Sequence, residues 1–343
     1  MSVNPDTNRD AADLNWGVPD LICCDSPAAL ADAGVRDVVF AIGTFDGLHR
    51  GHLAVIRAML DESRRLEAVP AVLTFRPHPR AVLSPDNPPP LLVSPERKLA
   101  ILASLGVKAV VTLPFTPEFA ALSPDGFLTR CLLAGSVRVR SVCAGSRWRF
   151  GARCAGDAAF LEARSHELGF VFRAVPEVCD DRGVVSSTRI REALSRGDVA
   201  FAARCLGRRP AITGVVVGGY GVAGTELRCP TANLDVRGGM VPANGVYAAF
   251  AVVGGGRFPA VVNIGVAPTF DSYGAPKVRV EAHLLVDGAP DLYGAEMALG
   301  FAARIRGEVK FPSPAALAER IREDVRLARA LLNEQAQTSV PEG

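Results

Sequence analysis

The sequence predicts a parallel α/β domain followed by a small antiparallel β-barrel domain with a C-terminal helix. Before residue 207, apolar segments typical of buried strands alternate with segments of helical periodicity, and this alternation favours a parallel sheet wrapped by helices. After it, short strand candidates follow one another between Gly, Pro and Asp residues, as in small antiparallel barrels. The change of pattern places a domain boundary near residues 205–211.

The chain of 343 residues is long enough for two domains. Its start, MSVNPDTNRDAADLN, is polar and lacks the apolar core of a signal peptide. We therefore expect a disordered leader at residues 1–20, an α/β domain at 21–205 and a barrel domain at 206–343.

The α/β domain has four strand candidates separated by helix candidates. Apolar runs mark the strands, and apolar residues three and four positions apart mark the helices. Between the second strand and its helix we expect a Pro-rich loop at residues 77–95. The strand candidates are VVFAIGTF (38–45), AVPAVLTF (68–75), KAVVTLPF (108–115) and VRSVCAG (139–145); the helix candidates are residues 53–66, 95–106, 123–135 and 186–207.

The barrel domain has five strand candidates and one long helix. The helix spans residues 313–335 and ends the predicted structure. Spacing typical of an amphipathic helix gives it one apolar face, made of Leu317, Ile321, Val325, Ala328 and Leu332. The strand candidates are AITGVVVGG (211–219), NGVYAAFAVV (244–253), RFPAVVNIGV (257–266), VRVEAHLLV (278–286) and EMALGFAARI (296–305).

Composition and charge indicate an ordinary globular protein without a general surface for binding polyanions. The chain is 49% hydrophobic and 22% charged with a formal net charge of +2, so it has no excess of positive charge for nucleic acid. Its uncharged apolar runs are too short for a transmembrane helix. None of the eight cysteines lies in a C-x-x-C pair or at zinc-ligand spacing from a histidine. We expect a cytoplasmic protein without membrane or nucleic-acid partners.

The segment GTFDGLHRGH, residues 43–52, places two of the five histidines where the first strand candidate turns into a helix. A helix N-terminus presents free N–H groups that suit an anion such as phosphate. Glycines let a ligand approach the backbone closely, and His49 and His52 can donate hydrogen bonds to phosphoryl oxygens. The alternative is a pair of histidines that only cap a turn.

A second phosphate-binding candidate is SSTRIR, residues 186–191. Two serines, a threonine and two arginines at the start of a helix combine hydroxyl donors, free N–H groups and guanidinium forks. The alternative is a capped surface helix. H-x-G-H early in the chain and S-S-T-x-x-R late in it resemble the paired signatures of the nucleotidyltransferase superfamily.

Further motifs narrow the resemblance to one family. TFRPHPR (74–80), RFGARCAGD (149–157) and LGRRP (206–210) resemble the first module of the bacterial bifunctional riboflavin kinase/FMN adenylyltransferases. CPTANL (229–234), followed by NGVYA, NIGVAPTF, VEAHLL, DLYG and IREDVRLAR, resembles their second module. The motifs occur in the family's order over about residues 36–332.

For the first module, the resemblance implies adenylyl transfer from ATP to FMN with Mg²⁺ assistance, which gives FAD and pyrophosphate. His49 and His52 would contact the ATP phosphates from one side, and Ser187, Thr188 and Arg189 from the other. The other nucleotide-binding residues would be Gly43, Phe45, Asp46, Gly51 and Ser186. His78 and Arg147 would line the flavin site, although His78 is equally explained as a turn histidine fixed between prolines.

For the second module, the resemblance implies a riboflavin kinase. Thr231 and Asn233 would hold Mg²⁺ through neutral oxygens, and Glu281 would accept the proton of the riboflavin 5′-hydroxyl. No G-x-x-x-x-G-K-[ST] motif is present, because no lysine follows a glycine. The kinase would therefore not be of the P-loop type.

The sequence departs from the family pattern at two places. In GSRWRFG, Arg147 stands where the family has an acidic or amide residue. In GGYGVAGTELRCPTAN, Ala223-Gly224 and Arg228-Cys229 replace the family's Gly-Arg and Gly-Phe pairs. Two alternatives follow: only one activity is retained, or the chain is a non-catalytic flavin-nucleotide-binding protein on the same scaffold.

A different enzyme class is suggested by G-x-G-x-x-G at Gly219, Gly221 and Gly224, which matches a dinucleotide fingerprint. That fingerprint requires a helix directly afterwards, but Pro230 follows within six residues. A Rossmann-type oxidoreductase is therefore the weaker hypothesis.

Overall fold

A computed structural model describes residues 21–218, 231–270, 276–286, 292–309 and 311–337. The leader expected at residues 1–20 lies outside the described residues. The described residues divide into two units. The first draws on Trp16–Pro90 and Glu96–Ser186, and the second on Leu91–Pro95 and Ser187–Gly343.

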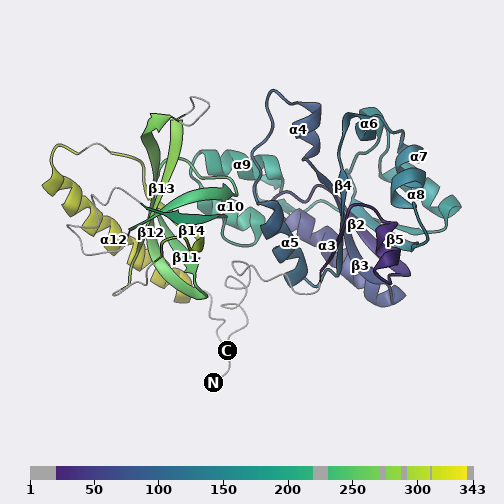
Figure 1. Cartoon of the computed structure of the whole chain (residues 1–343), viewed down its shortest axis with the longest axis horizontal. Coiled ribbons are helices and arrows are strands. Elements are labelled where there is room, and N and C mark those ends of the chain that lie inside the picture. Colours follow the sequence, from purple (N-terminus) through teal and green to yellow (C-terminus); the bar gives the residue numbers. More distant parts are fainter. Residues whose placement is uncertain (1–20, 219–230, 271–275, 287–291, 310, 338–343) are drawn as a thin grey trace, which may run out of the picture. The chain divides into compact units, whose positions relative to one another are not determined.

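The first unit is built on a six-stranded sheet in the order β1-β4-β3-β2-β5-β6. All neighbouring strands are parallel, so the predicted α/β class is confirmed. Figure 1 shows α3 and α5 on one side of this sheet and α7 and α8 on the other. The strands are β1 (Ile22–Cys24), β2 (Asp37–Ile42), β3 (Val69–Arg76), β4 (Ala109–Pro114), β5 (Arg138–Gly145) and β6 (Val171–Val175).

The helices of this unit are short except for α3, and most begin at a side chain that caps them. Thr116, Ser123 and Asp157 each accept a hydrogen bond from a backbone N–H in the first turn of α6, α7 and α8. The helices are α2 (Ala29–Asp32), α3 (Arg50–Leu66), α4 (Pro79–Leu83), α5 (Pro95–Ser104), α6 (Pro117–Ala120), α7 (Pro124–Phe127) and α8 (Ala158–Leu168), with a hairpin of β7 (Cys179–Asp180) and β8 (Gly183–Val184) after β6.

The core of the sheet explains the apolar run of β2. Val38 and Phe40 pack with Phe127 of α7 and Leu161 of α8 on one face, while Val39 is equally buried between them along the strand. A strand covered by helices on both faces must be apolar at every position. β2 therefore lies at the centre of the unit, and its carboxyl end leads into the GTFDG turn.

Several elements of this unit differ from the sequence prediction. β1 and β6 add two strands at the edges of the sheet. The loop expected at residues 77–95 contains α4, because His78 caps it and Pro79 suits its first turn. The helix expected at 123–135 is instead α7 followed by a π-helical turn, Leu128–Leu132.

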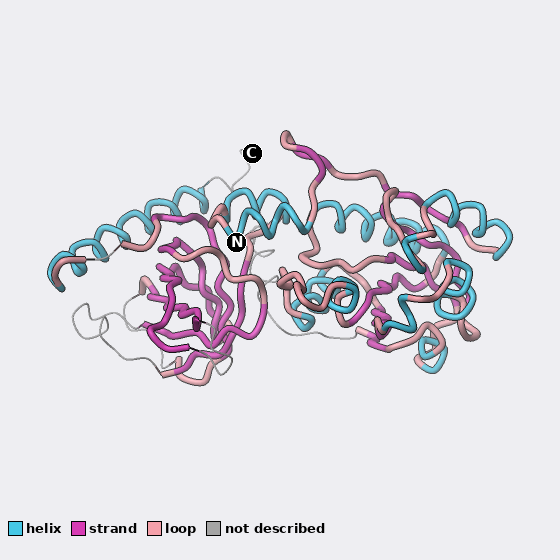
Figure 2. Tube along the Cα trace, turned by 90° about the horizontal axis from the view of Figure 1, so that it is seen from above, coloured by secondary structure: helices cyan, strands magenta, loops and turns pink. Residues whose placement is uncertain are grey.

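The second unit is a closed six-stranded barrel in the order β10-β13-β12-β11-β14-β9. Every neighbouring pair is antiparallel, which confirms the predicted barrel (Figure 2). The sequence pattern did not predict β10, the strand that carries the TAN residues. The strands are β9 (Ala211–Val217), β10 (Thr231–Gly238), β11 (Gly245–Val253), β12 (Gly256–Phe270), β13 (Pro276–Leu284) and β14 (Glu296–Arg306).

Two short helices precede the barrel where the sequence predicts one. The segment 186–207 forms α9 (Ser187–Ser195) and α10 (Val199–Leu206). Gly197 separates them with a φ of 77°, a conformation that favours glycine. Arg304 of β14 donates to the Arg196 carbonyl over 3.1 Å, so this turn is bonded to the barrel.

The C-terminal helix α12 (Pro314–Gln337) covers one face of the barrel. Ala328 and Leu332 of the predicted apolar face are buried there, but Leu317 is 37% exposed. Asp324, which lies on α12 between Leu317 and Ala328, is also buried and forms an ion pair with Arg306 of β14. In the described part of the chain, no helix is both long enough and apolar enough to cross a membrane.

Candidate active sites

The turn between β2 and α3 is buried and strained. Phe45 is 1% exposed and Asp46 is 2% exposed. Phe45 and Leu48 have φ values of 48° and 45°, in the left-handed region that residues other than glycine seldom adopt. Such conformations persist only where the surroundings impose them, and they are frequent at functional sites.

The two histidines of this turn are in direct contact. Their rings stack with centroids 3.7 Å apart and planes 19° apart. The His52 backbone N–H donates to His49 Nδ1 over 3.4 Å, so His49 caps α3. A neutral His49 that accepts at Nδ1 carries its proton on Nε2, where it can donate to an anion at the helix N-terminus.

Gly51 provides the space that this arrangement needs. A Cβ atom on Gly51 would lie 3.1 Å from His49 Cε1 and 3.8 Å from the Val185 carbonyl oxygen. Val185 directly precedes SSTRIR and belongs to the same unit as the histidines. The structure thus brings the residue before the second motif to the first motif.

The SSTRIR residues lie where the sequence predicts a helix to begin. Ser186 is the last residue of the first unit, and α9 starts at Ser187. Thr188 is exposed, and the Arg189 guanidinium lies 5.1 Å from the ring centre of Phe201. The expectation that these residues share phosphates with His49 and His52 stays a prediction.

The two predicted flavin-site residues have structural contacts of their own. His78 Nδ1 accepts from the Arg80 N–H over 3.1 Å, which agrees with the alternative of a histidine that fixes a turn. Arg147 is 75% exposed and lies 3.3 Å from both carboxylate oxygens of Glu177. Their roles toward flavin stay predictions.

A lysine that no sequence motif indicated lies at the strained turn. Lys98 of α5 donates to the carbonyl oxygen of Thr44 over 3.1 Å, and Thr74 Oγ1 donates to the same oxygen over 3.2 Å. The chain has only four lysines. That scarcity is the one sequence signal that could have drawn attention to Lys98.

In the barrel, three polar residues lie side by side on neighbouring strands. Asn233 of β10 and Asn263 of β12 both pair with Glu281 of β13, so the three residues share one face of the sheet. Asn263 Nδ2 donates to Glu281 Oε2 over 3.4 Å, and Arg279 Nε lies 3.5 Å from Oε1. The structure therefore places the predicted base, Glu281, directly across the sheet from one predicted magnesium ligand, Asn233.

Two residues before Asn233 on β10, Thr231 is the backbone partner of His283 on β13. Burial, followed by the positive charge of Arg329, lowers the pKa of His283 below its usual value.

Within the described ranges, no three His, Cys, Asp or Glu residues gather as a metal cluster. Ala223-Gly224, Arg228-Cys229 and the glycines of the dinucleotide fingerprint lie outside the described residues.

Comparison with protein families assigns each unit. A model described as FAD synthetase matches residues 32–189, and one described as riboflavin kinase matches residues 206–332. The Escherichia coli K12 protein named bifunctional riboflavin kinase/FMN adenylyltransferase is 36% identical over 88% of this chain and 94% of its own length. The chain belongs to this bifunctional family. The Rossmann oxidoreductase hypothesis is therefore wrong.

Other members of the bifunctional riboflavin kinase/FMN adenylyltransferase family match over a similar extent. The Pseudomonas fluorescens protein is 37% identical over 86% of this chain and 93% of its own length. The Bacillus subtilis protein is 33% identical over 83% of this chain and 90% of its own length. A crystal structure from Streptococcus pneumoniae, titled a macrolide-efflux protein, has a TM-score of 0.79 and 27% identity, and covers 90% of this chain and 99% of that one.

Proposed function

We propose that the chain makes FAD from riboflavin in two ATP-dependent steps. The barrel unit phosphorylates riboflavin to FMN, and the α/β unit transfers an adenylyl group from ATP to FMN. The observation that carries the proposal is the stacked histidine pair at the N-terminus of α3, found in a chain that the FAD synthetase and riboflavin kinase models both match.

In the adenylyl transfer, an FMN phosphate oxygen bonds to the α-phosphorus of ATP, and the bond from that phosphorus to the β-phosphate oxygen breaks. Pyrophosphate leaves. His49 Nε2–H and the first N–H groups of α3 would donate to the phosphoryl oxygens as their charge grows. Gly43, Phe45, Asp46 and Gly51 would shape the turn so that the nucleotide can approach the backbone.

Ser186, Ser187, Thr188 and Arg189 would contact the same phosphates. The support is local: Val185 lies against Gly51, and Ser186 follows it in the chain. The hydroxyl groups, the helix N-terminus and the guanidinium are all suited to an anion.

In the kinase reaction, the riboflavin 5′-oxygen bonds to the γ-phosphorus of ATP, and ADP leaves. Glu281 would take the proton of the hydroxyl group. Asn263 and Arg279 each contact one of its carboxylate oxygens, and these contacts orient the carboxylate.

The residues beside Glu281 fit Mg²⁺. Asn233 is the cross-strand partner of Glu281 and would contribute a hard neutral oxygen, and Thr231, two residues earlier in the chain, would contribute a hydroxyl group. Mg²⁺ is commonly held by few protein oxygens together with substrate phosphates and water. When bound, it would neutralise charge on the ATP phosphates in each reaction.

The proposal is tested by incubating the protein with riboflavin, ATP and Mg²⁺ and separating FMN and FAD chromatographically. Glu281→Gln should reduce FMN formation by about 10²- to 10⁴-fold while FAD formation from supplied FMN is unchanged. The double change His49→Ala and His52→Ala should reduce FAD formation by about 10²-fold or more while FMN formation continues.

Each possible failure points to a different error. A wild-type protein that makes FAD from supplied FMN but no FMN from riboflavin is an adenylyltransferase only, and one that does neither is a flavin-nucleotide-binding protein. If the histidine double variant forms FAD at the wild-type rate, the adenylyl site is wrongly placed. If Glu281→Gln is silent in an active kinase, the base is another group.

A further inference from the structure

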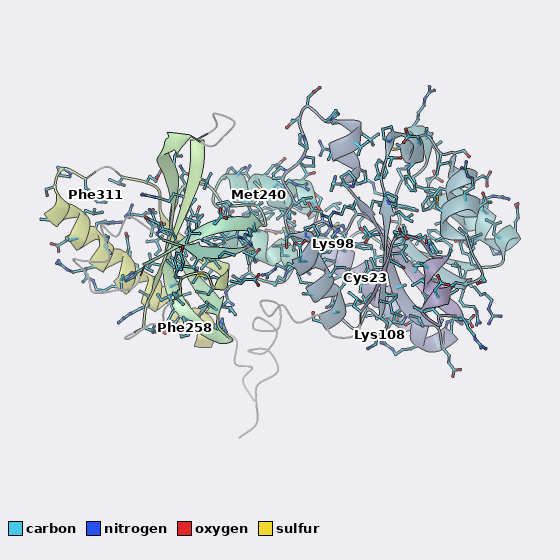
Figure 3. All side chains as sticks on the ribbon, viewed as in Figure 1. Cys23, Lys98, Lys108, Met240, Phe258 and Phe311 are labelled. Carbon is cyan, nitrogen blue, oxygen red and sulfur yellow. The ribbon has the colours of Figure 1, made fainter. Side chains whose placement is uncertain are left out.

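Lys98 brings a positive charge to the buried side of the strained turn that precedes His49. Its half-buried side chain comes from α5 (Figure 3). The ammonium group donates to the Thr44 carbonyl oxygen over 3.1 Å and lies 3.5 Å from Thr74 Oγ1. The proposed reaction steps use neither Lys98 nor Thr74.

The Thr44 carbonyl accepts two hydrogen bonds, from Lys98 and from Thr74 Oγ1. A carbonyl oxygen has two lone pairs, so these donors occupy both. The carbonyl belongs to the planar peptide group that joins Thr44 to Phe45. The two hydrogen bonds therefore fix the orientation of this peptide plane. The backbone of Phe45 leaves that plane with a left-handed φ of 48°.

Phe45 contacts the histidine pair through its ring. Its ring meets the His52 ring edge-on with centroids 5.3 Å apart, and His52 stacks on His49 at 3.7 Å. The buried residue Asp46 on the same turn also favours the charged form of Lys98.

We propose that Lys98 is a positioning residue for adenylyl transfer. By holding the Thr44–Phe45 peptide, it keeps Phe45, His52 and His49 in the arrangement that receives the nucleotide phosphates. This inference rests on the proposed function of the α/β unit, and it assigns Lys98 no contact with substrate.

The inference has a consequence for pH dependence. Desolvation lowers the pKa of Lys98 below its usual value; Asp46 on the turn after β2 opposes this shift, and Arg76 at the end of β3 adds to it. Raising the pH therefore removes the ammonium charge earlier than at an exposed lysine. As the pH rises and Lys98 loses its proton, its hydrogen bond to the Thr44 carbonyl weakens. The rate of FAD formation should therefore decline on the alkaline limb of the pH–rate profile.

The test compares Lys98→Met with Lys98→Arg, and Lys108→Met is the matched control because Lys108 is an exposed lysine of the same unit. Lys98→Met should lower kcat for FAD formation about tenfold or more, as expected when reacting groups are misplaced, with less than about threefold change in KM for ATP. Lys98→Arg keeps the charge, so it should retain most activity and move the alkaline limb to higher pH. Lys108→Met should change neither.

A measurement without substrate separates this inference from the proposed function. Amide hydrogen exchange of residues 44–52 should be faster in Lys98→Met than in the wild type or in Lys108→Met, because opening of the turn is easier. Unchanged exchange overturns the positioning role even if the wild type makes no FAD. So does a loss of activity through KM alone, or an alkaline limb that Lys98→Arg does not move. If the wild type makes no FAD and exchange is faster in Lys98→Met, the hold on the turn stands and the proposed activity fails.

Discussion

A methyl group on Gly51 would lie 3.1 Å from His49 Cε1, closer than the ring can accept without moving. Gly51 lies in the first turn of α3, where alanine is otherwise the better helix former by about 1 kcal/mol. We expect Gly51→Ala to lower FAD formation about tenfold, since small misplacements of reacting groups are costly, without lowering the melting temperature.

The control for this prediction is Gly145→Ala. Gly145 ends β5 in the same unit, and a Cβ atom there would meet nothing within 4 Å. Steady-state kinetics and thermal melts of the two variants should therefore differ in activity only. Equal activity in both would show that the His49 ring position does not matter.

The site residues that the sequence predicted are close to one another in the chain. His49, His52 and Gly51 are joined by one turn, so their spacing alone predicts a shared site. Lys98 is 54 positions from Thr44, and only the packing of α5 beside the ends of β2 and β3 brings the two together. Asn263 was missed for the same reason, because it meets Glu281 through strand register.

The attachment of α12 to the barrel depends on a buried ion pair. Asp324 is 2% exposed and accepts from Arg306 Nε and Nη2 over 3.0 and 2.8 Å. Removing one partner leaves the other charge buried, which costs about 3–5 kcal/mol. We expect Asp324→Ala to lower the free energy of unfolding of the barrel unit by about that amount, measured by urea denaturation.

Glu323→Ala is the matched control for this change. Glu323 is the neighbouring residue and forms an ion pair with Arg320, but its side chain is 46% exposed. Exposed pairs contribute about 0–1 kcal/mol. A loss with Asp324→Ala no larger than with Glu323→Ala would mean that apolar packing of Ala328 and Leu332 alone holds the helix.

Sequence patterns predicted the elements that are apolar throughout and missed those shaped by their neighbours. β2 to β5 are buried and rich in Val, so their sequences identify them. β10 reads TANLDVRG, with Asn, Asp and Gly residues that are uncommon in strands. It is a strand because β9 and β13 pair with it on both sides. The break between α9 and α10 was missed because it is confined to two residues, Gly197 with its positive φ and Asp198, which caps α10.

The histidine pair follows a strand of the parallel sheet and Glu281 lies on a strand of the barrel, so the two activities should be separable between molecules. Glu281→Gln lacks the first step, and the histidine double variant lacks the second. We expect a mixture of the two variants to make FAD from riboflavin and ATP, although neither does so alone, because FMN released by one molecule can bind another. Chromatography of the mixture over time gives the measurement.

Two supplementary assays complete this experiment. FMN supplied to Glu281→Gln should yield FAD, and riboflavin supplied to the histidine double variant should yield FMN. If both succeed and the mixture still makes no FAD, FMN does not pass between molecules, and the two units act together within one chain.

The order of strands in the barrel has a consequence for synthesis. β9, its earliest strand, pairs with β10 and also with β14, its last. The barrel therefore cannot close until β14 has left the ribosome. The parallel sheet needs nothing beyond Val175, so it can form while the barrel is still being made. Until closure, β9 presents an unpaired edge to other nascent chains, which makes this interval the time of greatest risk of aggregation.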